Sequence, residues 1–118
     1  MSGEKVIEPG EKIHVAFRRL FEGDMRRHFI GEVVIATESM IRAQGYTHLF
    51  DPRANLWVRH PEFRVRLISL TDETAMINVL PRDASPEAAG YAVNDAGHLV
   101  MTDGETFALE VNEFGVTH

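Results

Sequence analysis

Hydrophobic and polar residues alternate along most of the chain, in short runs that turn-forming residues interrupt about every 8–12 residues. Runs rich in β-branched and aromatic residues predict nine strands, at residues 12–21, 27–36, 40–50, 56–60, 63–70, 74–80, 90–94, 98–102 and 106–112. No segment keeps a helical period for more than about two turns. We expect at most one short helix, and the best candidate is 85–89, where Ser85 can cap the first turn and Pro86 can begin it. The pattern therefore predicts an all-β protein.

The connections between the expected strands are short and carry turn residues. Asp51 and Pro52 begin one connection, Asn94 begins another, and the Asp103–Gly104 pair is the strongest hairpin signal in the chain. Consecutive strands joined in this way form an antiparallel meander, which closes into a small barrel or folds as a two-sheet sandwich. The stretch 81–89 is the only long linker and marks a candidate sub-boundary. We expect a flexible N-terminal segment over 1–11 and a single β domain over 12–118.

A pairing register predicts which residues share a face of the sheet, because side chains alternate across a strand. Around the turn at 37–39, pairing Ala36 with Met40 aligns an apolar core row made of the pairs Phe29–Thr47, Val33–Ala43 and Ile35–Ile41. A slip of one residue would bring polar side chains into this row. Around the next turn, pairing Phe50 with Leu56 sets Leu49 opposite Trp57, so Trp57 is expected in the core.

Two other strands are expected to have one face in the core and one in solvent. In 12–21 the inward side chains are Ile13, Val15 and Phe17, and the outward ones are His14, Ala16 and Arg18. In 63–70 two arginines alternate with three apolar residues, and we expect the apolar side, made of Phe63, Val65 and Leu67, to be the dry one.

The face opposite the core row gathers three histidines around a tyrosine. The register places His28 opposite His48, and Tyr46 between Ile30 and His60. Directly opposed residues have Cβ atoms about 5 Å apart, so His28, His48 and His60 can bind zinc or another divalent cation. Without a metal, His28 or His48 can act as an acid–base, because imidazole titrates near neutral pH. The same side chains also occur as ordinary cross-strand pairs on a half-exposed sheet, which requires no cofactor.

Charge is distributed unevenly along this acidic chain, whose net charge is −6. Between Lys12 and Arg66 there are ten bases against six acids, and nine of the ten bases are arginine. From Asp83 onward there are seven acids and neither lysine nor arginine. The basic segment and the acidic segment can attract each other either within one fold or between protomers. The second option predicts a homo-oligomer joined through the basic middle and the acidic C-terminal segment.

Two arginine pairs flank the segment 20–25 and can grip an anion, because guanidinium groups suit carboxylate and phosphate partners. Acids inside the same segment can instead hold these arginines in salt bridges. Together with two residues of the histidine-bearing face, the pairs make up the candidate ligand-binding set: Arg18, Arg19, Arg26, Arg27, Arg42 and Tyr46.

Composition narrows the classes of protein further. At 118 residues, with 44% hydrophobic and 25% charged residues, the chain is long enough for one domain with its own core. It contains no cysteine, so disulfides and thiolate metal sites are excluded. It shows no hydrophobic leader and no apolar run of about 20 residues, so we expect a cytoplasmic protein without a membrane span. The acidic net charge argues against a nucleic-acid partner.

These features favour a non-catalytic binding or self-assembly module, in which an arginine-rich rim engages an acidic partner or an anionic ligand. The alternative is a histidine-cluster protein on a β-barrel face, either metal-binding or an acid–base enzyme. The chain contains no nucleophile elbow, phosphate-binding glycine loop or HExxH motif, so no motif decides between the two.

Overall fold

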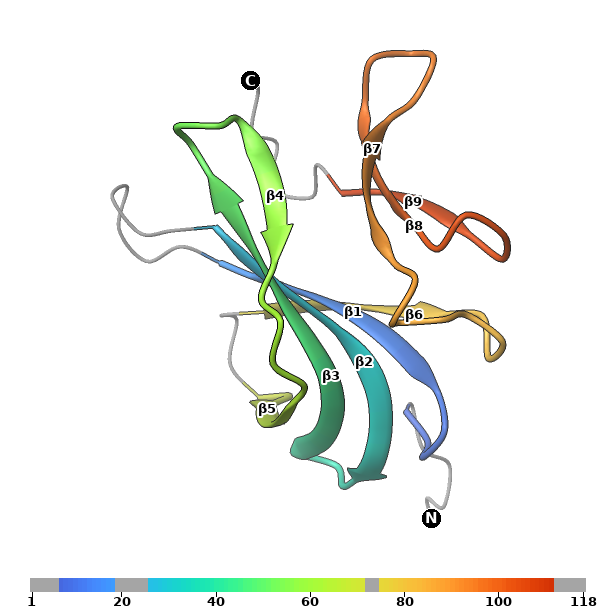
Figure 1. The fold of residues 1–118 in the computed structure, drawn as a ribbon. Coiled ribbons are helices and arrows are strands. Elements are labelled where there is room, and N and C mark those ends of the chain that lie inside the picture. The colour runs from blue at the N-terminus through green and yellow to red at the C-terminus, as the bar shows by residue number, and fades with distance from the viewer. Residues whose placement is uncertain (1–6, 19–25, 72–74, 112–118) are drawn as a thin grey trace.

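A computed structural model describes residues 7–18, 26–71 and 75–111, which form nine β-strands in two antiparallel sheets (Figure 1). The strands of the larger sheet are β1 (Lys12–Phe17), β2 (Arg27–Ala36), β3 (Met40–Asp51), β4 (Leu56–Arg59), β5 (Arg64–Ser69) and β6 (Ala75–Leu80). The smaller sheet contains β7 (Gly90–Val93), β8 (Leu99–Thr102) and β9 (Ala108–Glu110). The predicted all-β antiparallel fold is confirmed, and it takes the form of a two-sheet sandwich that does not close into a barrel.

The larger sheet is organised around the long strand β3. Its strand order is β4-β3-β2-β1-β6, and β5 also pairs with β3. The first half of β3 pairs with β5 through residues 40–45, whereas the second half pairs with β4 through residues 48–51. Consequently β5 and β6, which are neighbours in sequence, lie at opposite edges of this sheet. The smaller sheet has the simple order β7-β8-β9.

The turns follow the chemistry that the sequence indicates, except at residues 85–89. The backbone N–H of Ala88 bonds to Ser85, and that of Ala89 bonds to the carbonyl of Pro86, but this single turn does not continue as a helix. The described residues contain no helix, so the one short helix that the sequence allows near 85–89 does not form. A helix needs several turns to offset its nucleation cost, and here β7 begins at Gly90, directly after the turn.

Asp103 ties the linker to the turn between β8 and β9. Its carboxylate accepts hydrogen bonds from the hydroxyl and backbone N–H of Thr106, the backbone N–H of Glu105 and the backbone N–H of Ser85. These donors, with the Thr106 hydroxyl first, hold the pKa of Asp103 well below its usual range. Gly104 follows with a φ of 88°, a left-handed conformation that glycine adopts without strain.

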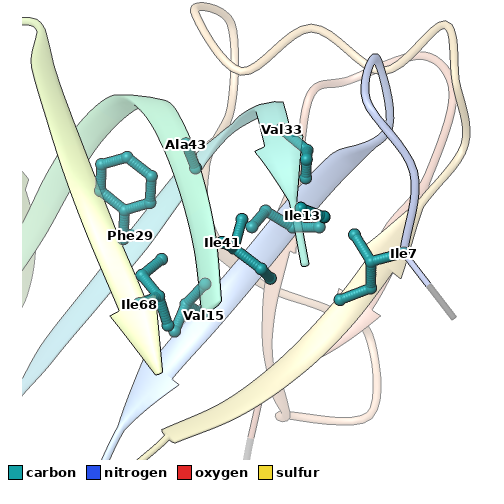
Figure 2. Close-up of a cluster of buried hydrophobic side chains, with 9 residues drawn as sticks. Ile7, Ile13, Val15, Phe29, Val33, Ile41, Ala43 and Ile68 are labelled. Atoms are coloured by element: carbon teal, nitrogen blue, oxygen red, sulfur yellow. The ribbon is translucent and has the colours of Figure 1, made fainter. Parts of the chain in front are cut away.

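One face of the larger sheet forms the first hydrophobic core (Figure 2). The pairs Phe29–Thr47 and Val33–Ala43 confirm the predicted register of β2 and β3. The core also includes Ile41 of β3, and three further parts of the chain contribute Ile7, Ile13 and Val15, and Ile68. Residues 7–11 pack against the sheet, because Ile7 is buried and Gly10 and Glu11 both bond to the backbone of Val33. The packed body therefore begins before Lys12.

A β-bulge separates Val33 from Ile35 and changes the end of the hairpin. After the bulge, Ile35 lies opposite Arg42, and Ala36 lies opposite Ile41. The predicted pair Ile35–Ile41 is therefore wrong, because one extra residue in β2 turns Ile35 outward and returns Ala36 to the core row. Ile35 is 55% exposed, whereas Ala36 is buried.

The second core lies between the two sheets. The larger sheet and the linker contribute Ile30, Leu80, Ala84 and Ala89, and the remainder of the chain contributes Met101 and Val111. Because the smaller sheet covers this face, β1 is buried on both sides, with His14 and Ala16 fully enclosed. The prediction that His14 and Ala16 point to solvent is therefore wrong.

Two glycines face each other in the pairing of β2 with β3. Gly31 is paired with Gly45. A Cβ at Gly45 would lie 2.1 Å from the carbonyl oxygen of Ile30, and one at Gly31 would lie 2.3 Å from that of Gln44. Both obstructions are backbone atoms, so the strands can come this close only because neither residue carries a side chain.

We expect Gly45→Ala to lower the free energy of unfolding by at least about 2 kcal/mol, because the added methyl group forces two strands apart. Gly90→Ala is the matched control, since a Cβ there would meet nothing within 4 Å. Urea denaturation followed by the fluorescence of Trp57, the single tryptophan, measures both variants. Equal stability of the two variants would contradict the close approach.

Candidate functional site

Three histidines on adjacent strands face the smaller sheet. His14 lies on β1, His28 on β2 and His48 on β3. The register pairs His28 directly with His48, as the sequence predicts. The prediction does not include His14, because it treats the outer side of β1 as solvent-exposed. The alternation of β1 places His14 on the same face, and only the covering sheet shows that this face is interior.

A chain of hydrogen bonds crosses from the larger sheet to the smaller one through two of these histidines. The Asn78 amide donates to Nδ1 of His14 (3.2 Å), and Nε2 of His14 lies 3.1 Å from Nδ1 of His28. The hydroxyl of Tyr91 on β7 lies 2.6 Å from the same His28 nitrogen. With His14 accepting at Nδ1, its Nε2 carries the hydrogen, and His28 is the acceptor for both neighbours.

Aromatic rings enclose the histidines. Trp57 on β4 stacks on Tyr91 with ring centroids 4.6 Å apart and an interplanar angle of 14°, and it lies 4.3 Å from the His28 ring. Tyr91 also meets the ring of His48 edge-on at 5.4 Å. The five residues His14, His28, His48, Trp57 and Tyr91 are called the histidine–aromatic cluster below.

Trp57 enters this cluster because the pairing of β3 with β4 differs by one residue from the prediction. Phe50 lies opposite Trp57, and Asp51 lies opposite Leu56. The Asp51 carboxylate accepts bonds from the backbone of residues 53 and 54, and Asn55 closes the turn with a φ of 54°. The turn is thus one residue shorter than assumed. The expectation of Leu49 opposite Trp57 is wrong, and Trp57 points to the histidine face.

The three imidazoles are neutral at pH 7. His14, His28 and His48 are 0%, 6% and 2% exposed, and this burial is the main cause that lowers the pKa of each. The pKa falls to about 4 for His14 and His48 and to about 3 for His28. Repulsion between positive charges adds to the effect: protonation of His14 or His48 would oppose that of His28, and Arg59 opposes protonation of His48.

Arg59 closes the cluster on the side of β4. It lies opposite His48, its guanidinium covers the ring of Tyr46 at 4.5 Å, and it donates a hydrogen bond to the carbonyl of Glu87 in the linker (2.5 Å). Among the side chains that the structure describes, Nε2 of His48 is a buried polar atom without a hydrogen-bond partner.

The predicted metal trio is not gathered as expected. The sequence places His60 opposite Tyr46, but the one-residue difference in the turn sets Arg59 opposite His48 and brings the backbone N–H of His60 to the carbonyl of Thr47 (2.8 Å). Alternation then directs His60 to the other face, where its Nδ1 lies 3.9 Å from Glu62. In residues 7–18, 26–71 and 75–111, no group of three or more His, Asp or Glu side chains is arranged to hold a metal ion. Zinc binding stays a prediction from the sequence.

The candidate ligand-binding residues fall into two places. Near one end of the β2–β3 pair, Arg18 and Arg27 are exposed, Arg27 covers the ring of Phe17 at 5.5 Å, and Arg26 covers that of Phe50 at 5.7 Å. Arg19 lies outside the described residues. At the other end, Arg42 is exposed opposite Ile35, and Tyr46 follows it on the same face of β3.

Beside Arg42 and Tyr46, strand β5 presents an apolar row to solvent. Phe63, Val65 and Leu67 are 54%, 57% and 64% exposed. The prediction that this row faces the core is wrong: Val65 and Leu67 lie opposite Gln44 and Arg42 on the outer face, which the smaller sheet does not cover here. The arginine side of β5 turns inward, and Arg66 donates to the hydroxyl of Thr47 (3.2 Å).

This outer surface is called the β5 face below, and it comprises Ile35, Met40, Arg42, Gln44, Tyr46, Phe63, Val65 and Leu67. Tyr46 and Phe63 meet edge-on with ring centroids 5.6 Å apart, so the two strands present a continuous surface. The sequence signal for it is weak, because strict alternation on an edge strand fits either orientation equally well.

No protein-family model matches the chain, and no curated protein or solved structure shows significant similarity to it. Within the described ranges, no helix is long and apolar enough to cross a membrane. The geometry offers two candidate sites for a function: the enclosed histidine–aromatic cluster and the open β5 face.

We expect stability to fall as the pH drops from about 6.5 toward 4. An unfolded histidine has a pKa of about 6.5, so in this window the unfolded chain binds protons that the folded protein does not. Each of the three histidines can cost up to about 1.4 kcal/mol per pH unit. Urea unfolding at pH 7.5, 6.5, 5.5 and 5.0 measures the slope, which His28→Leu should reduce. A free energy of unfolding that is equal at pH 7.5 and 5.0 would contradict the burial of neutral imidazoles.

Proposed function

We propose that the protein is a non-catalytic binding module that assembles with copies of itself through the β5 face. The observation that carries this proposal is the row formed by Phe63, just before β5, and by Val65 and Leu67 on β5, each more than half exposed. Single exposed apolar residues are common, but a contiguous row of three with an aromatic end is typical of an interaction surface.

The position of β5 supports the same function. Among the described strands, β5 pairs only with β3, so its other side is an edge of the sheet. Edge strands accept an additional strand from a partner, with backbone hydrogen bonds supplying affinity and alternate side chains supplying specificity. The exposed row then lies next to the added strand.

Arginines set the charge preference of this surface. Arg42 lies within the β5 face, and the guanidinium of Arg59 covers the ring of Tyr46 at its border (4.5 Å). Guanidinium groups around an apolar row favour a partner with carboxylates. In this proposal these two arginines take the role that the sequence suggests for the doubled arginines near residues 20–25, at a different place in the fold.

The histidine–aromatic cluster gives less support to the alternative of an acid–base enzyme. A catalytic base must come within hydrogen-bonding distance of its substrate, directly or through a water molecule. The three histidines are at most 6% exposed, and His14 and His28 already bond to side chains of the protein. The arrangement supports a structural joint between the sheets.

We expect the wild-type protein to form oligomers whose mass rises with concentration, and Val65→Glu to weaken this association at least tenfold. A buried glutamate in the contact would be desolvated and would repel the carboxylates of the partner. Val79→Glu is the matched control, because Val79 is 50% exposed on β6, at the opposite edge of the larger sheet. Size-exclusion chromatography with light scattering between about 5 and 500 μM decides the outcome. A wild-type monomer throughout that range would overturn the proposal.

A further inference from the structure

We infer that the histidine–aromatic cluster is an acid-sensitive joint, which releases the β7–β9 sheet from the larger sheet while the first core stays folded. This inference concerns the face between the two sheets, so it does not rest on self-assembly through the β5 face. Three buried imidazoles, a chain of hydrogen bonds that only neutral rings can make, and the lack of a nearby carboxylate among the described residues support it.

The hydrogen bonds of the joint require His28 to be neutral. Nε2 of His14 and the hydroxyl of Tyr91 both lie within hydrogen-bonding distance of Nδ1 of His28, at 3.1 and 2.6 Å. His14 is fixed as the donor of its bond, because its Nδ1 accepts a hydrogen bond from the Asn78 amide. A proton on Nδ1 of His28 would turn this acceptor into a donor that points at the N–H of His14. The chain of bonds that leads from β1 to β7 therefore breaks when His28 is protonated.

The charges that act on the three imidazoles oppose protonation. Arg26 acts on His28, Arg59 acts on His48, and the protonated histidines would repel one another. Asn78 on β6 and Tyr91 on β7 contribute an uncharged amide and a hydroxyl. The described elements around the joint carry further charged side chains, none of which acts on the three imidazoles: Lys12, Glu32, Arg42, Arg82, Asp83, Glu87, Asp95, Asp103, Glu105 and Glu110. A proton that enters the closed joint thus meets no compensating charge there.

Acid favours the open joint because imidazoles in water bind protons more tightly than imidazoles in the closed joint. Burial holds the pKa of the three histidines at about 3 to 4, whereas a histidine exposed to water has a pKa of about 6.5. Between pH 7.5 and 5, each histidine raises the ratio of open to closed protein about 30-fold, and the three together raise it about 10⁴-fold. We expect the joint to open between pH 5 and 4, where the same ratio rises about 10²-fold further.

Release of the smaller sheet leaves the first core intact. The buried residues of the first core all lie between Ile7 and Ile68, and none belongs to the β7–β9 sheet. The second core, in contrast, joins Ile30 of the larger sheet to Met101 of the smaller one. Residues 81–89 connect the two sheets along the chain (Figure 1). Since protons gain access to all three histidines once the smaller sheet separates, acid has no comparable reason to unfold the larger sheet.

Amide hydrogen exchange of the wild-type protein measures the two sheets separately. Mass spectrometry follows the exchange, and the rates are corrected for the intrinsic rate at each pH. Between pH 5 and 4 we expect the protection of β8 to fall at least tenfold, while the protection of β2 around Phe29 stays unchanged. The fluorescence of Trp57, which stacks on Tyr91, should change over the same interval. Loss of protection in both sheets together, or full protection of β8 at pH 3.5, would overturn the inference.

The variant His48→Leu tests whether the imidazoles cause the opening. Leucine removes one titrating group and leaves no buried polar atom in place of Nε2, which has no hydrogen-bond partner among the described side chains. We expect β8 to open at lower pH in this variant, with about two protons bound on opening where wild type binds about three. The matched control is His98→Leu, because the side chain of His98 is 51% exposed in the smaller sheet, and this variant should open like wild type.

Circular dichroism at pH 7 confirms that both variants are folded. An unchanged opening pH and proton number in His48→Leu, or an equal shift in His98→Leu, would show that the buried imidazoles do not sense the acid. If His48→Leu does not fold, the exchange pattern of the wild-type protein decides the question alone.

Discussion

The contact between the two sheets is the interaction on which the rest of this structure depends. The larger sheet is strongly bent, and one of its faces encloses the first core around Phe29 and Ile13. Its other face carries three histidines together with Ile30. Partial burial of these imidazoles without hydrogen-bond partners would cost free energy. The β7–β9 sheet covers this face with Met101 and Tyr91, so that apolar burial and a hydrogen-bonded chain of side chains act at the same joint.

The smaller sheet covers only part of this face of the larger sheet. Residues beneath it are buried, and residues beyond it remain exposed to solvent. Where the smaller sheet reaches, imidazoles lose contact with water, and their pKa values fall because the charged form is disfavoured by burial. Where it does not reach, the side chains of β5 remain in solvent although they are apolar. The three histidines, which carry the most reactive side chains, therefore stabilise the joint between the sheets. The apolar side chains of β5 form the open surface.

Much of the architecture could be predicted from the sequence, because alternation and turn chemistry are local. The positions of the nine strands, the pairing of His28 with His48 and the hairpin at Asp103–Gly104 all follow from short segments. The errors have non-local or single-residue causes. A bulge after Val33 reversed Ile35, and a turn one residue shorter than assumed moved Trp57 to the other face. No pattern within β1 or β5 shows which of its sides a distant sheet will cover, so His14 and Leu67 were placed incorrectly.

Direct observation of the imidazoles is the sharpest test of the account, whose central claim is that the smaller sheet seals three neutral histidines. Nuclear magnetic resonance can follow the ring signals of His14, His28 and His48 as the pH is lowered from 8 to 5. The sealed joint predicts that these three signals stay at the positions of neutral imidazole throughout that range. Titration of all three with midpoints near 6.5 would show that the face is open to water and would contradict the arrangement of the two sheets.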